Sequence, residues 1–157
     1  MRSTASASIT SYHFSASHRL YSANFSEAEN KRLYGKCSNP FGHGHNYTLE
    51  VLLTGPVDSD TGMIANLADL DAFVDREVIQ DFDHRYLNEE IPVFSCTVPT
   101  TENVCSEIHQ RLAAFPYAHL ERIKIEETSN NSFEYYEDVA DEASAVPQLS
   151  EAREGAN

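Results

Sequence analysis

The sequence predicts an α+β domain in which an antiparallel β-sheet carries two helices on one face. Near both ends of the chain apolar residues recur at every second position, which is the period of a strand with one buried face. Two segments between them carry apolar residues three and four positions apart, as amphipathic helices do. The expected order is two strands, two helices and two strands, in a chain of 157 residues that suffices for one domain.

Two strands are expected first, over residues 9–18 and 43–53. In the first strand the residues that share one face are Tyr12, Phe14, Ala16 and His18. The second strand is rich in β-branched and aromatic residues and ends at Gly55 and Pro56. Residues 22–36 between them are polar and charged, and we expect a connection there.

Two helices should follow. The first begins after Asn66, a good N-cap, and runs to about Asp81. Its apolar stripe consists of Leu67, Leu70, Val74 and Val78. The second begins at Thr100 or Thr101 and ends at Pro116. Its buried stripe consists of Val104, Ile108 and Leu112.

A hairpin should close the sheet. Ile123 and Ile125 alternate with charged residues on a third strand, and Asn130–Asn131 is a turn signal before a fourth strand with Phe133 and Tyr135. From Glu137 the chain is acidic and rich in Ala and Ser, with little to bury. We therefore expect a domain over 1–136 and a flexible acidic tail over 137–157.

The charge balance limits the possible partners. The chain has 11 basic and 25 acidic side chains and a net charge of −14, which disfavours nucleic acid and anionic membranes as partners. Residues 18–47 nevertheless carry four basic and two acidic side chains, which leaves room for a local anion site. Three cysteines, no signal peptide and no membrane-spanning stretch predict a cytoplasmic protein.

Three histidines form a candidate metal site. His43 and His45 flank Gly44, so that both imidazoles lie on one face of the second strand. Alone, such a pair is more typical of ordinary core or surface histidines than of a metal site. His18 is a third inward-facing imidazole on a neighbouring strand, and three neutral imidazoles without a fourth protein ligand are typical of catalytic zinc. The open position would take water or substrate.

Two further segments carry potential acid–base groups. Cys37 lies in a turn beside Lys36, whose positive charge would stabilise a thiolate, so that Cys37 is a candidate base or nucleophile; the alternative is a thiol without function. Asp83 precedes His84, and a carboxylate near an imidazole can fix its tautomer and raise its basicity. The alternative for this pair is an ordinary feature of a helix C-terminus.

Glu127 is a candidate ligand-binding residue. Strand alternation from Ile123 and Ile125 turns Glu127 inward, and a buried carboxylate needs partners. It could accept two parallel N–H bonds from an amino-pyrimidinone edge. An internal salt bridge to an arginine is an equally good interpretation.

Taken together, six segments resemble the 6-pyruvoyl-tetrahydropterin synthase family in register over residues 8–136. They are FSASHRL at 14–20, CSNPFGHGHNY at 37–47, TGM at 61–63, DHRYLN at 83–88, TTEN at 100–103 and ET at 127–128. The resemblance implies the tunnelling fold, in which ββααββ subunits associate into a barrel, commonly a homohexamer built as a dimer of trimers, with active sites between subunits. It also implies that 7,8-dihydroneopterin triphosphate is converted to 6-pyruvoyl-tetrahydropterin.

The resemblance assigns a role to each matching residue. His18, His43 and His45 would hold Zn²⁺, and Cys37 would abstract a proton with Asp83 and His84 as its relay. Glu127 would anchor the pterin. Among the remaining substrate contacts we expect Thr101, with Arg19 and Lys36 as the first candidates for the triphosphate, although a solvated surface role suits each of these two cations equally well.

Two other functions stay open. Related enzymes of the queuosine pathway, the 6-carboxy-5,6,7,8-tetrahydropterin synthases, act on the same triphosphate and release acetaldehyde. They typically have three residues between the cysteine and the first histidine of the motif. This chain has five, Ser38 to Gly42, and this spacing favours the pyruvoyl product. The pair Asn130–Asn131 favours the same product. A non-catalytic zinc- and pterin-binding module is the other alternative. The combination of Cys37, Asp83 and His84 argues against it.

Overall fold

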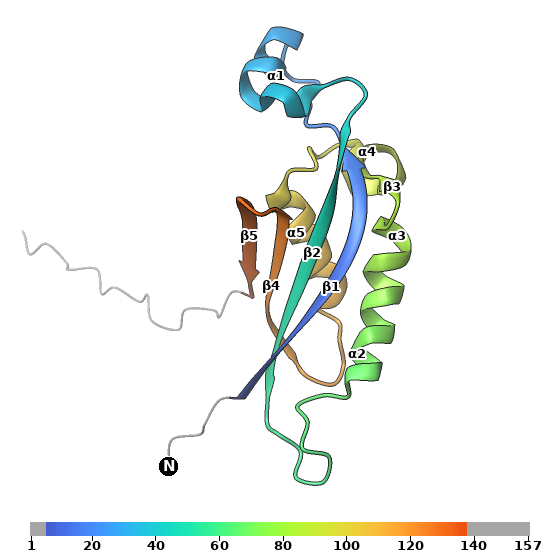
Figure 1. Cartoon of the computed structure of the whole chain (residues 1–157), viewed down its shortest axis with the longest axis vertical. Helices are drawn as coiled ribbons and strands as arrows, with labels where there is room; N and C mark the ends of the chain where they lie inside the picture. Colours follow the sequence, from blue (N-terminus) through green and yellow to red (C-terminus); the bar gives the residue numbers. More distant parts are fainter. Residues whose placement is uncertain (1–5, 138–157) are drawn as a thin grey trace, which may run out of the picture.

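The computed structural model describes residues 6–137, which form one five-stranded sheet with helices on one face (Figure 1). The strand order is β3-β1-β2-β4-β5. The strands are β1 Ser6–His18, β2 His43–Gly55, β3 Arg85–Tyr86, β4 His119–Thr128 and β5 Asn131–Tyr136. The α+β class and the antiparallel sheet are confirmed, except that the short edge strand β3, which was not predicted, runs parallel to β1. The expected tail over 137–157 lies, apart from Glu137, outside the described residues, and its boundary stays a prediction.

Strands β1 and β2 pair over their whole length, from Ser6 opposite Gly55 to His18 opposite His43. Alternate residues of both strands are buried beneath the helices, among them Phe14, Tyr47 and Leu49. Because the pairing has no bulge, the two histidines at its last position face the same side of the sheet. The register therefore brings together residues that are 25 positions apart in the sequence.

The first predicted helix is a single long helix with one wide turn. It consists of α2 Leu67–Val74, a π-helical turn η2 Asp75–Ile79 and α3 Gln80–Phe82, and Asn66 caps its start (Figure 1). Its buried residues are spaced by four: Leu70, Val74, Val78 and Phe82. In a regular α-helix three steps of four residues rotate the stripe by about 120°. The π turn takes more residues per turn and keeps all four side chains on the core.

The second predicted helix is α5, Thr101–Leu112. The Thr100 hydroxyl caps it by accepting a hydrogen bond from the N–H of Asn103. The helix ends at Leu112 and not at Pro116, because Phe115 leaves the helical path and packs into the core. None of the helices in residues 6–137 is long and apolar enough to cross a membrane.

The segment expected to be a plain connection contains a helix. Helix α1, Glu27–Tyr34, stands at the end of the β1–β2 pair and leads into a 3-10 turn, η1 Gly35–Ser38 (Figure 1). Ser26 and Glu29 form a capping box at its start. Asn30 is buried, accepts a hydrogen bond from the N–H of Ser22 and donates to nearby carbonyl oxygens. The short helices α4, Leu87–Glu90, and η3, Pro92–Ser95, were likewise not predicted.

Candidate metal centre and active site

Three imidazoles converge where β1 ends and β2 begins. His18 and His43 form the last cross-strand pair, and His45 lies on the same face one pleat along β2. The Nε2 atoms of His18 and His43 are 3.2 Å apart. One ligand atom from each of the three histidines lies within 4.8 Å of the others. The structure thus brings the predicted ligand set together.

The surroundings of His18 fix its protonation. Its Nδ1 lies 2.8 Å from the carbonyl oxygen of Pro99, which can only accept, so that Nδ1 carries the hydrogen and Nε2 presents a lone pair to His43. His18 is fully buried, and this burial lowers its pKa to about 4. Burial, together with the neighbouring His45, also lowers the pKa of His43. Neutral imidazoles are the form that binds metal ions.

The donor set fits a divalent metal ion such as Zn²⁺. Nε2 of His45 is buried and has no hydrogen-bond partner in the described part of the chain. Buried polar atoms are rarely left without a partner unless an ion or a ligand fills the gap. Two nitrogens bound to one tetrahedral zinc at 2.0–2.1 Å lie about 3.3 Å apart, close to the spacing of His18 and His43.

Glu127 faces this centre, as predicted. Its Oε1 lies 3.5 Å from Nε2 of His18 and 3.8 Å from Nε2 of His45. The pairing of β4 with β5 shifts register between Glu126 and Thr128, so that Glu127 sits on a bulge. Within residues 6–137 the titratable groups within 4 Å of its carboxylate are these two histidines, and the alternative of a salt bridge to an arginine is wrong.

A polar bridge holds the other oxygen of this carboxylate. The side-chain nitrogen of Asn131 donates both to Oε2 of Glu127 and to Oγ1 of Thr101, each at 3.0 Å. Thr101, the predicted substrate contact, is buried at the start of α5. Asn131 therefore joins two expected substrate contacts, a role that the sequence analysis missed because it took Asn130–Asn131 as a turn and as a feature of the pyruvoyl-forming branch.

Tyr47 is a second residue that the sequence interpretation missed. It is fully buried, and its hydroxyl lies 3.3 Å from Nδ1 of His18. Alternation along β2 from His43 and His45 could have placed Tyr47 on this face. Burial, and then the charge of Glu127, raises its pKa, so that the hydroxyl stays protonated.

Cys37 lies in η1, and this turn is tied to the end of β1. The Cys37 carbonyl oxygen accepts from the N–H of Leu20 at 2.8 Å, and Nε of Arg19 donates to the Ser38 carbonyl oxygen at 2.9 Å. Burial, and then the charge of Glu127, raises the pKa of the Cys37 thiol. The sequence predicted that the charge of Lys36 would stabilise a thiolate at Cys37. In the isolated chain this prediction is wrong, because the pKa of the thiol is raised and Lys36 lines a hollow that does not include Cys37.

Asp83 and His84 lie beside the outer edge of β1. Oδ1 of Asp83 accepts from the N–H of Ser15 at 2.8 Å, and the N–H of His84 donates to the Ser15 carbonyl oxygen at 2.6 Å. Nε2 of His84 is 3.7 Å from Oδ2 of Asp83, beyond hydrogen-bond distance. No hydrogen bond or ion pair within residues 6–137 joins this pair to Cys37 or to the three histidines.

His84 adopts an unusual backbone conformation. Its φ is 58°, in the left-handed region that non-glycine residues seldom occupy. Its side chain is 83% exposed, and His84 lines a surface depression of about 510 Å³ together with Ser17, Asn46 and the candidate metal ligand His45. Strain of this kind is concentrated at functional sites. The fold therefore presents His84 outward.

Gly42 is expected to be essential to the geometry of the metal centre. Its φ is +69°, and a Cβ there would lie 2.9 Å from the carbonyl oxygen of His18. We expect Gly42→Ala to lower the free energy of unfolding by about 2–3 kcal/mol, from backbone strain plus this clash, and to weaken metal binding. Chemical denaturation and zinc titration measure the two effects.

Gly62→Ala is the matched control, because Gly62 has a φ of +71° and no atom within 4 Å of the added Cβ. It should show only the backbone cost, about 1–2 kcal/mol, and normal zinc affinity. Equal losses in the two variants would show that the contact with His18 is unimportant.

Three converging imidazoles, a thiol and a carboxylate are a set of groups suited to metal-assisted acid–base catalysis, which is the chemistry of an enzyme. Residues 8–138 match the family model described as 6-pyruvoyl tetrahydropterin synthase. The chain belongs to this family and is an enzyme, a lyase of the 6-pyruvoyl tetrahydropterin synthase type.

Individual relatives agree with this assignment. The chain is 47% identical over 123 residues to the 6-pyruvoyl tetrahydrobiopterin synthase of Pongo abelii, covering 78% of this chain and 85% of the relative. The solved Caenorhabditis elegans 6-pyruvoyl tetrahydropterin synthase superposes with a TM-score of 0.82 at 38% identity, over 88% of this chain and 99% of that one. A putative 6-carboxy-5,6,7,8-tetrahydropterin synthase of Archaeoglobus fulgidus is 39% identical over 92 residues, 59% of this chain and 72% of the relative.

Proposed function

We propose that this enzyme converts 7,8-dihydroneopterin triphosphate to 6-pyruvoyl-tetrahydropterin and triphosphate, with Zn²⁺ as its metal. The observation that carries the proposal is the position of Glu127, whose carboxylate lies within 4 Å of two histidines of the candidate metal centre. A carboxylate there can bind a pterin ring and hold its side chain beside the metal. The names of the relatives support the same reaction.

The residues divide the chemistry among themselves. Glu127 accepts the N–H groups of the amino-pyrimidinone edge, and Asn131 and Thr101 hold the carboxylate in place. When bound, Zn²⁺ would polarise the side-chain oxygens and acidify the neighbouring C–H bonds. Cys37, as its thiolate, takes a proton from the activated carbon and becomes a thiol, and His84, assisted by Asp83, moves protons to and from the side-chain oxygens.

For Cys37 and His84 to act on the same substrate, a second copy of the chain is required. His84 is exposed at the outer edge of β1 and has no link to Cys37 within residues 6–137. We propose that Asp83 and His84 complete the active site of a neighbouring subunit, in the homohexameric barrel of two trimers that the family resemblance implies.

The three cysteines are all free, which supports a reducing, cytoplasmic location.

Two observations favour the pyruvoyl over the 6-carboxy product. Five residues separate Cys37 from His43, as in the pyruvoyl-forming branch. The 6-carboxytetrahydropterin synthase relative also matches a smaller share of the chain than the pyruvoyl-forming relatives do. A non-catalytic binding module is disfavoured because Cys37, Asp83 and His84 are all present.

The deciding experiment incubates the zinc-loaded protein with 7,8-dihydroneopterin triphosphate, identifies the pterin product by mass spectrometry and assays acetaldehyde in parallel. We expect the pyruvoyl product and no acetaldehyde. Stoichiometric acetaldehyde with the carboxy product would move the enzyme to the 6-carboxy branch. An absence of turnover with intact metal would favour a binding module.

Asn131 is expected to control the affinity for the pterin. Asn131→Ala removes the hydrogen bonds to Glu127 and Thr101, so we expect KM to rise about tenfold while kcat changes less than threefold. The control is Asn130→Ala, since the neighbouring asparagine contributes only its backbone N–H, to Thr128. Steady-state kinetics distinguish the two. A loss of kcat at unchanged KM in Asn131→Ala would contradict this role.

A further inference from the structure

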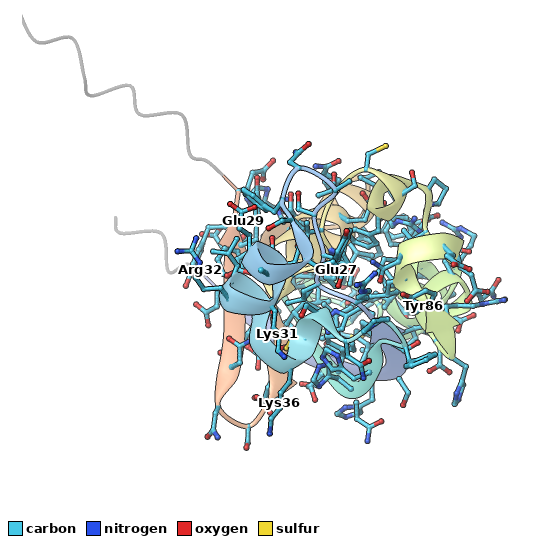
Figure 2. The ribbon with its side chains drawn as sticks, turned by 90° about the horizontal axis from the view of Figure 1, so that it is seen from above. Glu27, Glu29, Lys31, Arg32, Lys36 and Tyr86 are labelled. Atoms are coloured by element: carbon cyan, nitrogen blue, oxygen red, sulfur yellow. The ribbon has the colours of Figure 1, made fainter. Side chains whose placement is uncertain are left out.

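A hollow of about 450 Å³ lies between α1 and the turn η1, at the end of the molecule that Figure 2 shows from above. Its lining includes Arg19, Tyr21, Glu27, Lys31, Lys36 and Asn39. Neither the three histidines nor Tyr47 and Glu127 contribute to it. It is therefore separate from the candidate metal centre.

The cations around this hollow lack ion-pair partners. Four other arginines of the described residues, Arg76, Arg85, Arg111 and Arg122, are ion-paired, whereas Arg32, next to Lys31 in α1, is not. Arg19, Lys31 and Lys36 have no carboxylate within 4.0 Å among residues 6–137, and Glu27 is the one acid in the lining. In a chain with a net charge of −14, this concentration of free positive charge favours an anionic ligand.

The hollow has a rigid side and an adaptable rim. Nε of Arg19 donates to the Ser38 carbonyl oxygen, and its guanidinium lies 4.0 Å from the centre of the Tyr21 ring. This arrangement fixes the guanidinium plane and leaves its terminal N–H groups without a hydrogen-bond partner in the described residues. Lys31 and Lys36 add two exposed ammonium groups at the same hollow (Figure 2).

We propose that this hollow binds an oligophosphate group. Three cations with one opposing carboxylate suit a chain of phosphates better than a single carboxylate ligand, and a fixed guanidinium can bind phosphate through two N–H groups. Both cations expected from the sequence to contact triphosphate, Arg19 and Lys36, line it. Lys31 is the new member of the set.

The position of the hollow links it to the reaction. Four residues that flank Cys37 in the turn, Gly35, Lys36, Ser38 and Asn39, line the hollow, whereas Cys37 does not. The Cys37 carbonyl oxygen accepts from the N–H of Leu20, two residues after His18, so this turn lies against the end of β1 that carries His18. An oligophosphate in the hollow thus contacts the turn that positions Cys37.

The first test measures binding of inorganic tripolyphosphate to the zinc-loaded protein by calorimetry, with zinc content checked afterwards because tripolyphosphate chelates the metal. Lys31→Ala and Lys36→Ala should each raise Kd about tenfold. Arg32→Ala is the matched control, since Arg32 has the same charge and lies next to Lys31 in α1 but does not line the hollow (Figure 2). It should change Kd less than twofold. Lack of saturable binding, or equal losses in Arg32→Ala and Lys31→Ala, would overturn the proposal.

A second test identifies the source of the phosphates and rests on the proposed function. Inhibition by tripolyphosphate that is competitive with the pterin triphosphate, and is lost in Lys31→Ala, assigns the hollow to the substrate's own triphosphate. Non-competitive inhibition that is lost in the same variant assigns it to a separate oligophosphate, such as a nucleoside triphosphate. Both results support the site. The calorimetric binding test does not depend on turnover. Its result therefore still decides whether the hollow binds oligophosphate, even if the protein does not catalyse the proposed reaction.

Discussion

Replacing Cys37 with alanine is expected to lower kcat by about 10³-fold or more and to leave zinc bound. Proton abstraction by a positioned group contributes about 10²–10⁴-fold to rate, and we propose Cys37 as the only group in this role. The thiol is not one of the three converging imidazole ligands, so the metal site should persist. Turnover of 7,8-dihydroneopterin triphosphate and zinc content by mass spectrometry measure the two effects.

Cys96→Ala is the matched control for this prediction. Cys96 is exposed in the segment after α4, and its sulfur contacts only the hydroxyl of Ser95. The variant should retain full activity, which shows that loss of a thiol as such does not matter. Full activity in Cys37→Ala would remove Cys37 from the mechanism, and loss of zinc in that variant would show that the thiol supports the metal.

Replacing His43 with alanine is expected to weaken zinc binding by at least about 100-fold and to abolish turnover. Changes in residues that merely support ligands cost about 10–100-fold in metal affinity, and loss of a direct ligand should cost more. His43 is only partly buried, so the variant should still fold. Competition with a chelator measures the affinity. Zinc should also raise the melting temperature of the parent protein but not that of the variant.

His13→Ala is the control, since His13 lies on β1 and contacts Thr48 on the exposed side of the same strand pair. It should bind zinc normally. If both variants bind zinc as the parent protein does, the three histidines are not the metal site. If both lose it, the loss reflects damage to the β1–β2 pair.

The sequence predicted the faces of the strands better than their register. Alternation along residues 9–18 correctly turned His18 inward, and alternation from Ile123 correctly turned Glu127 inward. Alternation does not show which residues lie opposite one another, because shifting the pairing of two strands by an even number of residues leaves every side chain on the same face. The pairing of His18 with His43 and the bulge at Glu127 depend on contacts between distant segments.

Other features escaped prediction for specific physical reasons. Helix α1 has a weak apolar stripe, with Leu33 half exposed, so that periodicity does not reveal it; the capping box of Ser26 and Glu29 was the available signal. The effect expected of Lys36 on Cys37 failed because neighbours in sequence need not face the same side of a turn. The sequence suggested that Asp83 orients His84, whereas the structure leaves their side chains 3.7 Å apart, and the relay role stays a prediction.

The hydrogen bond from His18 to the Pro99 carbonyl oxygen has a consequence for how the enzyme matures in the cell. A nascent chain that has emerged as far as Gly55 already contains all three imidazoles on two strands that can pair. It lacks Pro99, which fixes the tautomer of His18, and Glu127, whose Oε1 lies 3.5 Å from Nε2 of His18. The complete surroundings of the three histidines are therefore present only once the chain extends through Glu127.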